Sequence, residues 1–324
     1  MQTLTAFDRY LTTFMARNPW TNVYGAVRSL LAFGTFCTLL FNDTGILFRP
    51  IAGMTECPNC VGMAQYSLFC VLGNLELARW LSMGILALVV IGIYPRFTAL
   101  LHVYVGFSLM STVILVDGGD QVTLVLSFLL LPLALTDPRK WHWSAAPGVE
   151  KTTYWFQVRK MVALTSYTLL RLQVALIYFE ACVGKFKVTE WADGTAIYYW
   201  FSNPVFGLSP EVHSLLLPIL ANRWCIVLLT WSVLIFEGSL FLGLTLDAKY
   251  RKYLLWMGIA FHFMIILIHG LPTFFMAMTS ALLIYLRPFD QPFSLKPVMR
   301  TFFPPLTLRY RTAESSPEVA TASA

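Results

Sequence analysis

The sequence predicts an all-α polytopic membrane protein, a bundle of about eight transmembrane helices with both termini cytoplasmic. Hydrophobic residues make up 57% of its 324 residues and charged residues only 12%, about half the charged share of soluble domains. The apolar residues form long runs, such as 121–136 and 253–286, which suit membrane spans. The net charge of +6 falls mostly between those runs and does not cluster as in a nucleic-acid groove. We therefore expect membrane lipid, and no nucleic acid, as a partner.

The individual spans follow from the breaks between apolar runs. Paired glycines at 118–119, the proline at 95 and the Gly-Leu-Pro turn at 270–272 allow chain reversals. Residues 66–79 look amphipathic, and 184–222 are rich in Trp and Tyr, so both stretches are expected at the membrane interface. The predicted spans are 24–41, 80–94, 97–116, 121–136, 162–183, 224–246, 253–270 and 272–286.

The basic residues predict the orientation of the bundle. With the N-terminus inside, sixteen Lys and Arg residues fall on the cytoplasmic side, five of them in the loop 137–160, and four fall outside. This asymmetry is the one expected of cytoplasmic loops. The sequence therefore divides into a cytoplasmic segment (1–23), a transmembrane domain (24–290) and a cytoplasmic polar tail (291–324), which we expect to be partly disordered.

Several ionisable residues lie inside the predicted spans, namely Arg28, Arg171, Glu237 and His262. A charge at the bilayer centre costs at least about 2.5–3.5 kcal/mol on insertion scales, so such residues face the bundle interior and need partners. Two interpretations stay open. The residues pair with one another and hold the bundle together, or they line a substrate or cofactor cavity.

The fifth span carries a stripe of functional groups. At about 100° per residue, Arg171, Tyr178 and Cys182 share one helix face, and Lys185 lies close to it if the helix continues. A lysine in a dry pocket beside another cation gives up its proton readily and acts as a base or nucleophile. The alternative is that Lys185 extends to the lipid headgroups.

Two further sets of polar residues have competing interpretations. Asp117 and Asp120 flank the Gly-Gly turn. Asp120 alone would cap the following helix, whereas the two carboxylates together would form part of a polar site or a weak cation site. His262 and His269 share a helix face, but seven residues separate them, too far for a zinc pair, so no metal is expected.

Cys57 and Cys60 form a single Cys-Pro-Asn-Cys motif in a predicted outer segment. A loop disulfide between them is favoured, because the exoplasmic compartment is oxidising. A redox-active pair is the alternative. The remaining cysteines are expected to be buried packing thiols; they are Cys37, Cys70, Cys182 and Cys225.

Four ordered motifs, at 18–32, 74–80, 117–121 and 135–143, resemble the SdpB family. These are membrane proteins of bacterial sporulation-delaying-protein-type toxin systems, and the resemblance covers residues 18–290. It implies a multi-pass protein of the bacterial plasma membrane that takes part in producing an exported antimicrobial peptide. It also implies two partners: a small SdpA-type protein and the secreted peptide precursor.

The stretch 178–194 is similar to the signature of the HTTM domain, the transmembrane domain of vitamin K-dependent gamma-carboxylase. In that domain a lysine ahead of a Trp and a Gly deprotonates a reduced quinone. The resemblance gives this position to Lys185, ahead of Trp191 and Gly194, and matches His262 to the histidine of a later span. It therefore implies a quinone as a possible cofactor.

Three functional hypotheses follow. In the first, the chain is an exoplasmic-facing maturation factor for a peptide toxin, with Lys185, Asp117, Asp120 and His262 as catalytic residues. In the second, it is a quinone-linked redox enzyme that uses Lys185 and the Cys57/Cys60 pair. In the third, it is a non-enzymatic export or immunity protein. The first hypothesis also predicts an outward-opening cavity lined by Arg28, Arg171, Tyr178, Trp191, Glu237 and His269.

Overall fold

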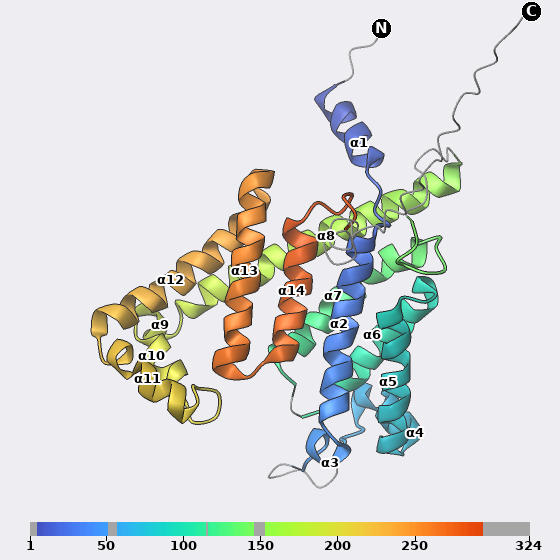
Figure 1. Ribbon diagram of the computed structural model, residues 1–324. Coiled ribbons are helices and arrows are strands. Elements are labelled where there is room, and N and C mark those ends of the chain that lie inside the picture. Colours follow the sequence, from blue (N-terminus) through green and yellow to red (C-terminus); the bar gives the residue numbers. More distant parts are fainter. Residues whose placement is uncertain (1–4, 51–56, 115, 146–152, 294–324) are drawn as a thin grey trace, which may run out of the picture. The chain divides into compact units, whose positions relative to one another are not determined.

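The computed structural model describes residues 5–50, 57–114, 116–145 and 153–293 (Figure 1). The chain divides into two units, Met1–Pro292 and Phe293–Ala324, and all the helices named below belong to the first unit. The regular structure of the described residues is helical, and one isolated β-bridge, between Ile93 and Trp141, stands in place of any strand. The predicted all-α class is therefore confirmed.

Eight long helices coincide with the eight predicted spans. They are α2 (Asn22–Phe41), α5 (Leu75–Ile91), α6 (Pro95–Thr112), α7 (Gly118–Thr136), α8 (Tyr154–Lys185), α12 (Arg223–Phe241), α13 (Ala248–His269) and α14 (Pro272–Leu286). Five of them, α2, α7, α8, α12 and α13, are long and apolar enough to cross a membrane. The full count of eight spans and the cytoplasmic termini stay predictions.

Shorter helices fill the connections. They are α1 (Ala6–Ala16), α3 (Thr44–Leu47), a 3₁₀ turn (Gly62–Tyr66), α4 (Leu68–Leu72), α9 (Thr189–Ala192), α10 (Ala196–Phe201), α11 (Pro210–Leu220) and a 3₁₀ turn (Leu242–Leu244). The Trp- and Tyr-rich stretch 184–222 is thus helical over α9–α11, which pack on α12 through their own apolar cluster.

The ends of the long helices are set by local sequence signals. Thr21 caps α2 by accepting a hydrogen bond from the amide of Val23, as Ser and Thr commonly do at helix starts. Gly92 and Gly270 end α5 and α13 in the left-handed conformation, which glycine adopts at little cost. Prolines stand at the first position of α6 and α14, where their missing N–H costs nothing.

Most helix ends differ from the predicted ones by one to five residues, and two of the larger differences are at the starts of α5 and α8. Residues 75–79, predicted to lie at the interface, belong to α5, because Asn74 caps that helix by accepting from the Leu77 amide. Helix α8 covers 154–185 instead of 162–183 and takes in the end of the predicted basic loop. With 32 residues it is about 48 Å long, which exceeds the roughly 30 Å hydrocarbon core, and Figure 1 shows it running obliquely to α13 and α14.

Helix α2 lies at the centre of the bundle, in contact with α5, α7 and α14. One apolar cluster joins α2, α7, α8, α13 and α14, and a second joins α2 to α3–α6. Both faces of α2 are therefore packed by other helices, which explains why it is the most buried of the candidate spans.

A buried polar cluster fastens α2 to the segment that follows α7. The Arg28 guanidinium, 1% exposed, donates to Thr98 Oγ1 at 2.9 Å and to His142 Nδ1 at 3.3 Å. His142 is fully buried, and burial, with the nearby cations Arg28 and Arg139, lowers its pKa to about 3. The imidazole is thus neutral at pH 7 and can accept from Arg28.

Asp137 and Arg139 hold the loop that carries His142. Arg139 pairs with the buried Asp137 carboxylate at 2.8 Å and also donates to the His142 carbonyl oxygen at 2.8 Å. The His142 amide in turn donates to the carbonyl oxygen of Gly92 at 3.0 Å. The loop is therefore tied at once to the end of α7 and to the turn between α5 and α6.

The turn at Gly92 yields a stability prediction. Gly92 has φ +91°, and a Cβ there would collide with the His142 ring. We expect Gly92→Ala to lower the stability by at least about 2 kcal/mol, from backbone strain and the collision, and to lower the melting temperature in detergent by several degrees. Gly84→Ala is the matched control, because its Cβ would meet open space within α5. A Gly92→Ala protein that melts with the wild type would contradict this packing.

Candidate functional site

The polar side chains of the C-terminal half centre on an ion pair between α8 and α12. Lys185 is the last residue of α8, and its Nζ lies 2.6 Å and 2.7 Å from the two carboxylate oxygens of Glu237. The same Nζ also donates to the carbonyl oxygen of Ala181 at 3.1 Å. The lysine side chain is 23% exposed and the glutamate 9%. The pair is thus enclosed but open on the lysine side.

The face of α8 that carries Lys185 is turned toward α12–α14. Cys182 Sγ contacts the carbonyl oxygen of Leu234 at 3.4 Å, and Tyr178 is buried at 2% exposure. Further back along the helix, Arg171 Nε donates to the carbonyl oxygen of Tyr285 at 3.1 Å. These side chains therefore share one face of α8, as the 100° spacing predicts.

Trp191 covers the lysine from the other side. Residues 186–188 turn the chain after α8, and α9 then brings the indole of Trp191 to 5.2 Å from Lys185 Nζ. Trp191 is 8% exposed. An ammonium at this distance from an indole ring gains a cation–π attraction of roughly 0.5–2 kcal/mol. Lys185 is thus held by a carboxylate and an aromatic ring together.

His262 joins this group through ring contacts. Its Nδ1 donates to the carbonyl oxygen of Gly258 at 2.7 Å, which fixes the ring along α13. The imidazole packs edge-on against Tyr178, with 6.2 Å between ring centroids, and at 5.8 Å from Phe274. The structure therefore gathers Lys185, Glu237, Tyr178, Trp191 and His262, and we call these five residues the α8–α12 site.

Lys185 has a carboxylate as its neighbour, whereas a lysine that acts as a general base needs a neighbouring cation. The prediction of a lysine base assumes a nearby cation, which would favour the neutral amine. Its partner is instead a carboxylate at 2.6 Å, which engages the nitrogen in an ion pair. The arrangement suits an ion pair that binds polar groups better than it suits a proton-abstracting amine.

The two aspartates of the Gly-Gly turn have structural partners. Asp117, and not Asp120, caps α7: its Oδ1 accepts from the Asp120 amide at 2.9 Å, and the Asp120 carboxylate accepts from the Asp117 amide at 3.4 Å. Asp117 Oδ2 also accepts from the Thr273 hydroxyl at 2.9 Å. Gly119 lies so close to the backbone of Phe274 that a Cβ would force the two apart. These contacts fasten the start of α7 to the start of α14.

The remaining predicted cavity residues lie elsewhere. Arg28 belongs to the His142 cluster, Arg171 binds the end of α14, and His269 Nδ1 donates to the carbonyl oxygen of Phe206. The predicted cavity residues thus fall into separate groups, and each group has its own hydrogen bonds. Any catalytic role of Asp117, Asp120 or His262 stays a prediction.

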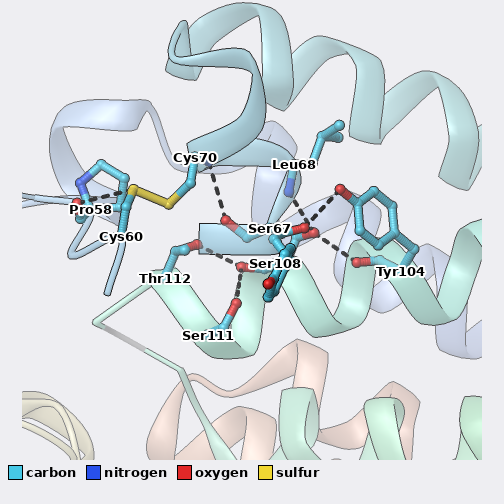
Figure 2. The surroundings of a disulfide bond; sticks show 10 residues. Pro58, Cys60, Ser67, Leu68, Cys70, Tyr104, Ser108, Ser111 and Thr112 are labelled. Atoms are coloured by element: carbon cyan, nitrogen blue, oxygen red, sulfur yellow. Dashed lines mark hydrogen bonds between the residues drawn. A yellow bond between two sulfur atoms is a disulfide. The ribbon is translucent and has the colours of Figure 1, made fainter. Parts of the chain in front are cut away.

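The disulfide differs from the predicted one. Cys60 is joined to Cys70, with 5.8 Å between their Cα atoms, and Cys57 lies outside this bond. Figure 2 shows the cause: the Ser67 hydroxyl caps α4, and the Leu68 amide donates to Ser108 Oγ of α6 at 2.9 Å. Short α4, held on α6 in this way, turns Cys70 toward Cys60. Cys70 is therefore not the packing thiol that the sequence suggests.

Comparison with known proteins decides the family. The chain is 40% identical over 298 residues to the sporulation-delaying protein SdpB of Bacillus subtilis (strain 168), covering 90% of this chain and 88% of that protein. The chain belongs to the SdpB family. It is also 40% identical over 293 residues to the uncharacterized protein YitO of the same strain, covering 89% of this chain and 90% of that one. No family model matches the chain, and no solved structure matches it.

Family membership confirms the resemblance that the four motifs carry. Those motifs include residues that make the polar contacts between helices, such as Arg28 in the first and Asp117 in the third. His142, which sequence reasoning did not select, stands in the fourth motif beside Asp137 and Arg139. The sequence did contain a signal for His142, because this histidine stands between two tryptophans in the basic loop 137–160. The relation to the HTTM domain stays a prediction.

The disulfide yields a direct chemical prediction. Peptide mapping of the unreduced protein by mass spectrometry is expected to recover the peptide of Cys60 linked to that of Cys70. The linkage should persist in Cys57→Ser and disappear in Cys70→Ser, which should also lose about 2–3 kcal/mol of stability because a closed loop is opened. Recovery of a Cys57–Cys60 linkage in the wild type would contradict the structure.

Proposed function

We propose that this SdpB-family chain is a multi-pass membrane factor in the production of a sporulation-delaying-protein-type peptide toxin. Three findings support the proposal: the family, the five helices that are apolar and long enough to span a membrane, and the α8–α12 site. The location of the functional site in this proposal rests on the Lys185–Glu237 pair. An ion pair inside an otherwise apolar bundle is costly to keep and marks a functional position by default.

The chemistry of the pair suits a transient binding role. Lys185 is exposed by about a quarter of its side chain (23%), next to the aromatic helices α9 and α10. A polar group of a peptide can therefore reach the ammonium, and Glu237 can accept a peptide amide when the lysine turns away. We infer that the site holds a polar part of the secreted precursor while an SdpA-type partner takes part in its maturation.

The orientation proposed is eight spans with both termini in the cytoplasm of a bacterial cell. Thr21 before α2 donates to the carbonyl oxygen of Phe289 after α14, and the Tyr94 amide before α6 donates to that of Lys140 after α7. These four segments therefore meet at one end of the bundle. That end carries many of the basic residues, such as Arg17, Arg96, Arg139, Lys140 and Arg287, which supports a cytoplasmic location.

The opposite end of the bundle has a different composition. It holds the Asp117–Thr273 contact, where α7 and α14 begin, and α3, where the chain leaves α2. The Cys60–Cys70 disulfide lies in the segment that joins α2 to α5 at this end. A disulfide is stable in an oxidising compartment, so its position supports an exoplasmic location of this end.

The quinone-linked alternative has weaker support. It combines Lys185 as a base with Cys57 and Cys60 as a redox pair. The lysine is engaged by Glu237, and Cys60 is engaged by Cys70. The third possibility is an export or immunity protein without catalysis. Variants of the Lys185–Glu237 pair distinguish it from the proposed function.

The functional test uses cells that express the chain with an SdpA-type partner and the precursor. We expect Lys185→Met and Glu237→Gln to lower the mature peptide, measured by mass spectrometry, at least tenfold, because each leaves one charge without its partner. Lys185→Arg should keep much of the yield. Lys187→Met and Glu190→Gln are matched controls on exposed side chains, and all variants are compared at equal amounts in the membrane. Unchanged yield from the inserted pair variants would favour the export or immunity function.

The orientation is tested with single cysteines labelled from outside intact cells. In a Cys→Ser background, a cysteine at Thr44 or Pro210 is expected to react with a membrane-impermeant maleimide. A cysteine at Lys140 or Ser144 should react only after the cells are opened, because it lies at the basic end. The reverse pattern would overturn the proposed orientation while leaving the fold intact.

A further inference from the structure

An apolar groove runs along the outer surface of α6, α7 and the middle of α8. Its volume is about 590 Å³, and one amide side chain, Gln173, stands among mostly apolar walls that include Phe107 and Phe128. Tyr104 also lines the groove, and its hydroxyl donates to the carbonyl oxygen of Tyr66. Three of the long helices thus leave an apolar furrow between them on the surface of the bundle.

Gln173 is out of place in such a groove. It is half-buried on α8, and its amide takes part in no hydrogen bond within the described part of the chain. An amide in an apolar medium loses its hydrogen bonds to water, which is unfavourable when nothing replaces them. Within bilayers, glutamine side chains commonly bond across to another helix.

Glu180 extends this polar strip along α8. It lies seven residues after Gln173, which places the two within about 20° of each other around the helix. Glu180 is exposed, and no ion pair or hydrogen bond engages its carboxylate in the described residues. Its face is opposite to the one that carries Tyr178 and Lys185.

The depth of Glu180 follows from its neighbours in the chain. Tyr178, two residues before, packs on His262 inside α13, and Lys185, five residues after, pairs with Glu237 inside α12. Both α12 and α13 are candidate spans, and neither contact lies at the last residue of its helix. Glu180 therefore lies between two levels that are both inside the bundle, with its carboxylate on the lipid side.

A second copy of this chain does not supply the missing charge. The basic residues deeper in the described long helices are engaged within the chain or buried: Arg28 binds Thr98, Arg171 binds Tyr285, and Lys160 is buried. Lys185, at the end of α8, pairs with Glu237. The other described basic residues lie in loops or within two turns of a helix end. A cation for Glu180 at this depth must therefore come from a different protein.

We propose that the groove of α6, α7 and α8 binds one transmembrane helix of a partner protein. That helix carries a hydrogen-bonding side chain that meets Gln173 and a Lys or Arg that meets Glu180. Two residues seven apart on one helix are about 10 Å apart along the axis, so the partner needs the same spacing. Apolar side chains between them fill the groove. The inference rests on insertion in a membrane and not on toxin production.

The test uses the full-length chain in lipid nanodiscs with a synthetic helix as the probe. The probe is a 21-residue Leu/Ala helix, about the length needed to span the bilayer, with Asn and Lys seven residues apart. A photoreactive benzoylphenylalanine replaces Phe128, an exposed lining residue. We expect at least fivefold more cross-linked adduct with this probe than with a probe of Leu and Ala alone.

Two controls make the test specific. Glu180→Gln is expected to reduce the adduct to the level of the Leu/Ala probe, while Glu190→Gln, also exposed, leaves it unchanged. The same photoreactive residue at Leu267, exposed on α13, should give little adduct with either probe. Equal melting temperatures of wild type and Glu180→Gln show that the variant is folded.

Three results would overturn the proposal. Equal adduct with both probes would mean that lipid or any apolar helix fills the groove. Insensitivity to Glu180→Gln would remove the carboxylate from recognition, and an adduct between two copies of the chain through position 128 would make the groove a homodimer interface. Because no toxin is involved, each of these results is independent of the proposed function.

Discussion

Arg28 and Lys185 carry charge into the apolar bundle of this protein and find their partners there, and that constraint organises the bundle. Arg28 is satisfied by Thr98 and a neutral His142, which ties the central helix α2 to α6 and to the loop after α7. Lys185 is satisfied by Glu237, which ties the end of α8 to α12. Apolar packing fills the space between the helices, whereas these pairings select which helices are neighbours.

The polar side chains on the two faces of the long helix α8 differ in whether the chain provides partners for them. Its inner face presents Arg171 and Lys185 to partners that the chain itself provides. Its outer edge presents Gln173 and Glu180 without such partners in the described structure. Under the proposed function, the first face suits handling of a peptide, and the second suits binding of a partner helix. One helix would then connect the site to the partner that completes it.

The sequence predicts the helices well and their long-range pairings poorly. Apolar runs with Gly and Pro breaks locate all eight long helices, because burial in lipid or in the bundle demands them, and the 100° spacing finds the face of α8. The Lys185–Glu237 contact could not be predicted, since it depends on how α8 crosses α12. The Cys60–Cys70 disulfide could not be predicted for a similar reason. The short helix α4 is positioned by a hydrogen bond from Leu68 to Ser108 of α6, forty residues away.

The most direct test of the central claim is a double-mutant cycle on the ion pair, measured as thermal unfolding in detergent. Lys185→Met is expected to cost about 3–5 kcal/mol, because it leaves the buried Glu237 carboxylate alone. Glu237→Leu is expected to cost less, because Lys185 is partly exposed, and the double variant should recover most of the loss. Such recovery would show that satisfaction of charge, more than the pair itself, holds α8 to α12. Single variants that unfold at the wild-type temperature would contradict the account.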